Sequence, residues 1–172
     1  MRGRWLIVGI AVVAAAAFAI SVQGGRWWSV AGIDGVEIGP FGAKSCFGGD
    51  CKSAGLGWTG GTERWMRTGT GAGTAGLLSM LTLLIVAAGA AARRVPRLAA
   101  KVALVSIATA AVTGALFAIQ LPSMPSVEVD RGLALFAAAI VLGAAACAAV
   151  LRAKSPPPAD RAPATALPPK PD

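Results

Sequence analysis

Four long stretches without a charged residue constrain the fold of this chain more than any other feature. They lie at about 5–22, 71–92, 102–121 and 132–151. Even the shortest, as a helix, is about 27 Å long and close to the ~30 Å hydrocarbon core of a bilayer. Only 14% of the residues are charged, against roughly 25% in soluble domains. The sequence therefore predicts an all-α membrane domain at 1–151, a bundle of four transmembrane helices.

The first stretch has a second interpretation, as a cleaved signal peptide. Arg2 and Arg4 form a basic start, and the triplet Ala-Phe-Ala at 17–19 fits a small-x-small cleavage site. The uncharged run is long for a signal peptide, however, and Trp5 stands at its inner edge, as tryptophan often does in membrane spans. We predict a retained helix, with processing of residues 1–22 as the alternative.

The distribution of charge predicts the orientation. With the N-terminus inside, the inner segments hold ten basic and two acidic residues, and the outer segments hold six of each. Cytoplasmic flanks of membrane spans are enriched in Lys and Arg. We therefore expect a multi-pass protein of the plasma (inner) membrane with both termini cytoplasmic. The basic residues form short flanks and no patch with interleaved aromatics, so nucleic acid is not an expected partner.

In this orientation residues 23–70 form a large outer loop. Short β-like segments at 27–31, 35–38, 43–46 and 51–54 alternate with glycines. Cys46 and Cys51 are separated by four residues, which suits a hairpin turn, and an oxidising compartment favours a disulfide between them. A zinc site is the alternative, but it needs about four ligands and the chain has no histidine. We expect a β-rich outer loop stapled by this disulfide.

Small residues in the second and fourth stretches predict close helix packing. The segment 71–76 matches G-x-G-x-x-G, but a nucleotide site needs a preceding strand and a downstream acid, and here a membrane span follows. We expect no nucleotide. Gly73 and Gly76, and Gly143 near Cys147 in the fourth stretch, are expected to let helix backbones approach.

The third stretch carries one polar stripe on a helical face. It consists of Ser106, Thr109, Thr113 and Gln120. The stripe has two interpretations, interhelical hydrogen bonding and the lining of a translocation path. None of the four stretches contains Asp, Glu, Lys, Arg or His, which ion and proton pathways usually contain. We favour hydrogen bonding and keep a subunit of a transporter or channel as the alternative function.

No catalytic site, metal site or cofactor is expected. The chain lacks histidine, the commonest general base, and offers no nucleophile beside a base. Residues 152–172 are rich in Pro and Ala without an apolar period and predict a disordered cytoplasmic tail. The segment Pro-Pro-Lys-Pro at 168–171 has a second interpretation, as a ligand of an SH3-type domain, although Pro-rich tails of this kind are usually linkers.

The predicted plan resembles the claudin and peripheral-myelin-protein superfamily of four-span membrane proteins. In that superfamily the first outer loop carries a tryptophan, then Gly-Leu-Trp, then two cysteines. The matching residues here are Trp27 or Trp28, the triplet Gly39-Pro40-Phe41 at the place of Gly-Leu-Trp, and the pair Cys46 and Cys51. The resemblance implies an outer antiparallel sheet stapled by a disulfide, and a role in assembly, adhesion or as an accessory subunit. The composition, rich in Ala, Gly and Arg, looks like that of a protein from a bacterium with a GC-rich genome, so we expect a bacterial protein.

The function that we expect is non-catalytic and depends on the outer loop. Besides the lipid bilayer, the expected partner is another membrane protein or a second copy of the chain. The aromatic residues of the loop are the candidates for the contact, because tryptophan is enriched at interfaces. They are Trp27, Trp28, Phe41, Trp58 and Trp65.

Overall fold

The computed structural model describes residues 2–31, 35–47, 49–93, 96–123 and 126–153. Its four long helices are α1 (Arg2–Gln23), α2 (Glu63–Ala91), α3 (Arg97–Ile119) and α4 (Arg131–Arg152). All four are long and apolar enough to cross a membrane, which is consistent with the predicted multi-pass membrane protein. They pack in a ring in which α1 contacts α2 and α4, and α3 contacts the same two helices. Of the tail predicted at 152–172, Arg152 is the last residue of α4, and residues 154–172 lie outside the described residues.

The helices bury small side chains and expose large apolar ones. Only 33–44% of each membrane-spanning window is buried inside the protein. Lipid removes the hydrophobic drive for helix association, so the backbones must approach closely to gain packing energy. The buried positions are mostly alanine and glycine, whereas the exposed ones include Leu81, Ile85, Val105, Val112 and Val141.

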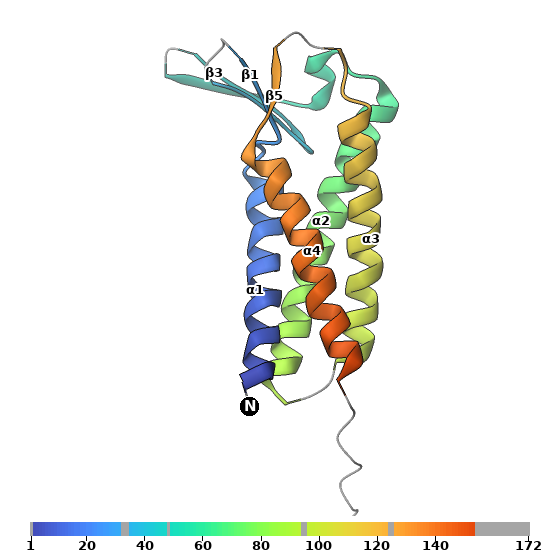
Figure 1. Ribbon diagram of the computed structural model, residues 1–172. Coiled ribbons are helices and arrows are strands. Elements are labelled where there is room, and N and C mark those ends of the chain that lie inside the picture. Colours follow the sequence, from blue (N-terminus) through green and yellow to red (C-terminus); the bar gives the residue numbers. More distant parts are fainter. Residues whose placement is uncertain (1, 32–34, 48, 94–95, 124–125, 154–172) are drawn as a thin grey trace, which may run out of the picture.

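A five-stranded antiparallel sheet covers one end of the bundle (Figure 1). Its strands are β1 (Trp28–Val30), β2 (Val36–Gly39), β3 (Gly42–Phe47), β4 (Asp50–Ala54) and β5 (Val127–Val129), in the order β4-β3-β2-β1-β5. We call this end of the bundle the sheet end. The N-terminus and the last turn of α4 lie at the opposite end, which we call the terminal end (Figure 1). The structure thus has the expected four long apolar helices and a small antiparallel sheet.

The fifth strand comes from the loop between α3 and α4, where the sequence predicted no strand. Trp28 of β1 pairs with Val129, and Val30 pairs with Val127. A three-residue strand carries too little alternation to be recognised alone, and this one depends on a partner about 100 residues away. The four strands of the first loop coincide with the expected β-like segments.

Helix α2 begins at Glu63, eight residues before the predicted span at 71–92. The hydroxyl of Thr62 caps it by accepting a hydrogen bond from the amide of Trp65 at 3.2 Å. One turn later Arg67 donates to Glu63 at 2.6 Å. Residues 63–67, which were expected in the outer loop, therefore form the first turn of α2.

Six aromatic side chains, which we call the aromatic cluster, join the sheet to the helices. They are Phe18 of α1, Trp27 and Trp28 at the start of β1, Trp65 of α2, Phe117 of α3 and Phe136 of α4. Neighbouring ring centroids lie 4.6 to 5.8 Å apart, within the range of favourable aromatic pairs. Each helix thus contributes one ring to a single contact region at the sheet end.

The polar atoms of the buried indoles are satisfied by hydrogen bonds. Trp27 Nε1 donates to the backbone oxygen and the hydroxyl of Ser21, both at 3.1 Å. The Ser21 hydroxyl in turn donates to the backbone oxygen of Gly132 at 2.7 Å, which connects α1 to α4. Trp65 Nε1 donates to the backbone oxygen of Phe117 at 2.9 Å. A buried indole without such a partner would cost about 1–3 kcal/mol.

Glycines on the helices leave room for these rings. A Cβ atom on Gly69 would lie 2.6 Å from the ring of Phe117, and one on Gly114 would lie 2.7 Å from the ring of Phe136. Both distances are well inside van der Waals contact. The glycines of α2 and α3 are therefore required by the shape of the aromatic cluster, despite their weak helix propensity.

We expect Gly114→Ala to destabilise the protein by about 1–3 kcal/mol, the usual cost of overpacking a core. The matched control is Gly9→Ala, because nothing lies within 4 Å of a Cβ at Gly9. Its effect should be neutral or slightly stabilising, since alanine is the better helix former. The measurement is unfolding in a titration with SDS, followed by tryptophan fluorescence. Equal unfolding curves for the two variants would contradict the packing role of Gly114.

Candidate functional site

The structure divides the five aromatic residues expected at a partner contact into two groups. Trp27, Trp28 and Trp65 are buried in the aromatic cluster, with exposed fractions of 0%, 2% and 0%. Their surfaces are used inside the chain and are not available to a partner in this conformation. Phe41 and Trp58 remain exposed, at 47% and 59%. The candidate contact therefore narrows to these two side chains.

Phe41 lies at the turn between β2 and β3, and one side of its ring contacts α2. A Cβ atom on Gly73 would lie 2.6 Å from this ring. Gly73 thus makes room for an aromatic side chain from the sheet and contributes to sheet–helix packing. Gly76 faces Val22, Phe136 and Phe18 in the same manner. Gly143 of α4 faces Ile107 and Leu83, so it serves helix packing, as expected from its small size.

The hairpin of β3 and β4 carries the cysteine pair at its outer end. Cys46 and Cys51 are direct cross-strand partners, and their sulfur atoms lie at disulfide distance, 2.13 Å. Every residue of β4 is exposed, and in the described part of the sheet β4 is an edge strand. An edge strand presents a row of unpaired backbone donors and acceptors to its surroundings.

One face of this hairpin forms a small groove under Trp58. The groove has a volume of about 120 Å³ and is lined by Ala43, Ser45, Lys52, Ala54 and Trp58. In the sheet Ala43 lies opposite Ala54, and Ser45 lies opposite Lys52, so these four residues share one face. We call this surface the hairpin groove. It combines an exposed indole, a cavity of side-chain size and a neighbouring edge strand.

The sequence did not single out Ala43, Ser45, Lys52 or Ala54 for function. Their period-two spacing on both sides of the turn places them on one face once the register is known. The missing information was the position of Trp58, which follows in the short 3₁₀ helix η1 (Leu56–Thr59). The backbone of Trp58 is fixed there by a hydrogen bond of 3.1 Å from its amide to the carbonyl of Gly55.

The polar stripe of the third span does not form one surface inside the bundle. Ser106 is buried, Thr113 and Gln120 are half-buried, and Thr109 is exposed. The hydroxyls of Ser106, Thr109 and Thr113 donate to backbone carbonyls of α3 itself, at 3.1, 3.0 and 2.7 Å. Gln120 is the residue that follows the last turn of α3. No hydrogen bond between helices involves these three hydroxyls within the described ranges.

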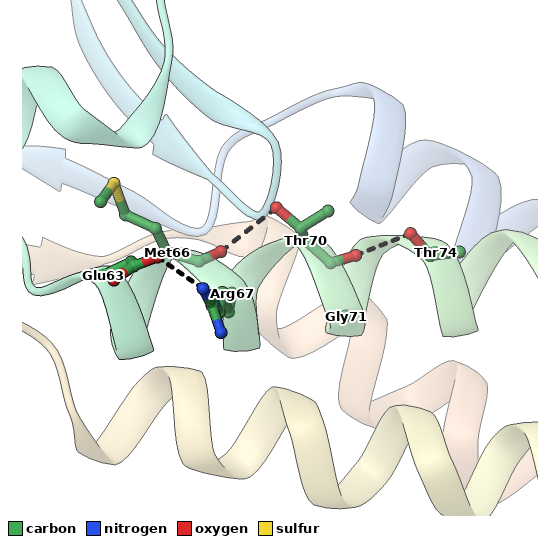
Figure 2. Close-up of a pocket in the computed structure, with 6 residues that line it drawn as sticks. All are labelled: Glu63, Met66, Arg67, Thr70, Gly71 and Thr74. Carbon is green, nitrogen blue, oxygen red and sulfur yellow. Dashed lines mark hydrogen bonds and ion pairs between the residues drawn. The ribbon is translucent and has the colours of Figure 1, made fainter.

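A second groove, of about 500 Å³, follows the sheet-end half of α2, and Figure 2 shows its lining. Thr70 and Thr74 donate to the carbonyls of Met66 and Thr70, at 3.2 and 2.8 Å. Glu63 and Arg67 form an ion pair with each other. All of its lining residues belong to α2, and their polar atoms bond along that helix. Among the described residues no group of three or more His, Cys, Asp or Glu side chains is placed to hold a metal ion.

We expect the double substitution Cys46→Ser and Cys51→Ser to loosen the hairpin without unfolding the bundle. Closing a loop of this length by a disulfide stabilises by about 2 kcal/mol through the entropy of the open state. Hydrogen exchange measured by mass spectrometry in detergent should therefore accelerate in residues 42–54. Peptides from the spanning part of α2 serve as the internal control and should keep their protection. Unchanged exchange in the hairpin would contradict the stapling role.

We compared the chain with known protein families and with curated proteins. No protein-family model matches the chain, and no curated protein matches it. What the sheet end does is therefore inferred from its own residues.

Proposed function

We propose that this chain is a non-catalytic membrane protein whose sheet end binds another membrane protein or a second copy of the chain. In this role it is an accessory subunit or a self-assembling component. The observation that carries the proposal is the exposed Trp58 above the hairpin groove, beside the fully exposed strand β4.

Each part of this surface suits protein recognition. Tryptophan is strongly enriched among the residues that dominate binding energy, because its large ring loses much apolar surface to water on contact. A groove of about 120 Å³ can take one inserted side chain. The open edge of β4 can accept a partner strand through its backbone hydrogen bonds. Lys52 supplies a charge that discourages indiscriminate strand pairing.

The proposal includes the orientation. We place the sheet end outside and both termini in the cytoplasm of a bacterial cell, since the excess of Lys and Arg lies in the segments at the terminal end. This location also places the Cys46–Cys51 pair in an oxidising compartment, where a disulfide persists.

We also propose kinship with the claudin-like four-span proteins. Two observations support it, the antiparallel order of β1 to β4 above four spanning helices and the disulfide-distance pair within that sheet. The transport alternative gains no comparable support, because the third-helix hydroxyls bond to their own helix and Thr109 points out of the bundle.

The test is native mass spectrometry of the protein after gentle extraction from its own membranes. We expect a stoichiometric complex, with a second copy or with another chain. Trp58→Ala should lower the associated fraction about tenfold or more, as loss of a central contact residue does. Trp5→Ala is the matched control, because Trp5 is also 59% exposed but lies at the terminal end.

Three results would contradict the proposal. They are a monomer in cross-linked native membranes, an equal effect of the two tryptophan variants, and full association of a Ser45→Arg variant. The last substitution fills the hairpin groove with a long charged side chain while the exposed indole is kept. It separates a role of the groove from a general effect of tryptophan on membrane anchoring.

A further inference from the structure

The face of the β3–β4 hairpin opposite the hairpin groove, together with β2, covers another cavity, which is larger than the hairpin groove. Its volume is about 500 Å³, and its lining comes from α1, the segment before β1, the sheet and α4. The lining residues are Ile20, Gly24, Arg26, Glu37, Lys44, Arg131, Gly132 and Leu135. We call it the junction cavity. Because side chains alternate along a strand, Lys44 faces this cavity while its neighbours Ala43 and Ser45 face the hairpin groove.

The junction cavity lies where the membrane-spanning helices meet the sheet. Ile20 belongs to the last turn of α1 and is 60% exposed on the outside of the bundle. Leu135 belongs to the second turn of α4, which packs beside α1. The apolar side of the cavity is therefore continuous with the lipid-facing surface. Its polar side consists of Glu37 and Lys44 of the sheet, Arg26 before β1 and Arg131 at the start of α4.

The charges that line the cavity are mainly positive. Arg26, Lys44 and Arg131 provide three cations, and Glu37 provides one carboxylate. Arg26 is already engaged, because it forms an ion pair with Glu37, which raises the pKa of the guanidinium. No carboxylate of the described residues lies at ion-pair distance from Lys44 or Arg131. Asp130 beside the cavity accepts a hydrogen bond from the Arg131 amide and leaves a net charge of about +1.

Backbone hydrogen bonds fix the segments that line the cavity relative to one another. The amide of Gly132 donates to the carbonyl of Arg26 at 2.7 Å, and the amide of Asp130 donates to the carbonyl of Trp27 at 2.9 Å. Glu37 and Lys44 are direct cross-strand partners in β2 and β3. A Cβ on Gly132 would collide with the carbonyl of Arg26, so the close approach requires glycine at this position. The basic side chains therefore start from fixed backbone positions.

We propose that the junction cavity binds the phosphate head group of an anionic phospholipid from the leaflet on the sheet side. Lys44 and Arg131 contact the phosphate, and an acyl chain follows Ile20 and Leu135 along the outside of α1 and α4. A volume of about 500 Å³ is within the range of small-molecule sites. Lys44 and Arg131 have no carboxylate at ion-pair distance among the described residues, which favours an anionic over a zwitterionic lipid. The apolar side of the cavity favours a lipid over free phosphate. The junction cavity lies on the opposite face of the β3–β4 hairpin from the hairpin groove, which we propose as the protein-binding surface.

The experiment is lipid titration of the delipidated full-length chain in a neutral detergent, followed by native mass spectrometry. The probes are dioleoyl phosphatidylglycerol, dioleoyl phosphatidylcholine and inorganic phosphate. We expect the wild type to prefer phosphatidylglycerol over phosphatidylcholine and to retain no inorganic phosphate. The double variant Lys44→Gln and Arg131→Gln should lose affinity for phosphatidylglycerol about 25-fold, since each basic side chain near an anionic head group contributes about fivefold.

The matched control is Arg64→Gln with Arg67→Gln, which removes the same charge from the exposed first turns of α2, outside the junction cavity. This control should keep the wild-type preference. The conservative pair Lys44→Arg and Arg131→Lys should also keep it, which separates loss of charge from misfolding. Equal binding of the two lipids, an equal loss in the control variant, or binding of inorganic phosphate in place of lipid would each overturn the proposal.

Discussion

The packing of Trp27 against helices α1, α3 and α4 is the interaction on which the rest of this structure depends. Its ring contacts Phe117 and Phe136, and its Nε1 atom bonds to Ser21, which bonds onward to Gly132. In lipid, helices gain little from the hydrophobic effect and must associate through close packing and hydrogen bonds. Trp27 supplies both at the point where the chain leaves α1. Because β1 begins at the next residue, the same contact positions the central strands of the sheet.

The sequence was sufficient to predict the elements whose signals are local. Four uncharged stretches predicted the spanning helices, and glycine punctuation predicted the strands of the first loop. The burial of Trp27, Trp28 and Trp65 was not predicted, because an aromatic residue near a membrane boundary has the same local pattern whether it anchors or packs. Their partners, Phe117 and Phe136, lie far away in the sequence. The same lack of long-range information concealed β5 and the lining of the junction cavity.

The side chains of the β3–β4 hairpin alternate between its two faces, so one face lines the hairpin groove and the other lines the junction cavity. Residues 43 and 45 face the hairpin groove with small side chains, and residue 44 between them faces the junction cavity with a positive charge. A shift of register by one residue would exchange these faces. The register of β3 against β4 is fixed at the outer end by the cysteine pair, and β3 is aligned on its other side by pairing with β2, which ends at Gly39 and Gly42. The staple between Cys46 and Cys51 therefore maintains the identity of both surfaces.

This arrangement has a consequence for how the two proposed ligands influence each other. A lipid head group at Lys44 and a protein partner at Trp58 both require the same hairpin to be ordered. Binding of the first ligand orders the hairpin and loses its conformational entropy, so the second ligand binds more tightly. Because coupling between two sites is reciprocal, each ligand raises the affinity for the other by the same factor. The disulfide reduces this coupling, because it has already removed much of the freedom of the hairpin. With the cysteines oxidised, the two surfaces therefore act nearly independently, although Lys44 of one surface is adjacent along β3 to Ala43 and Ser45 of the other.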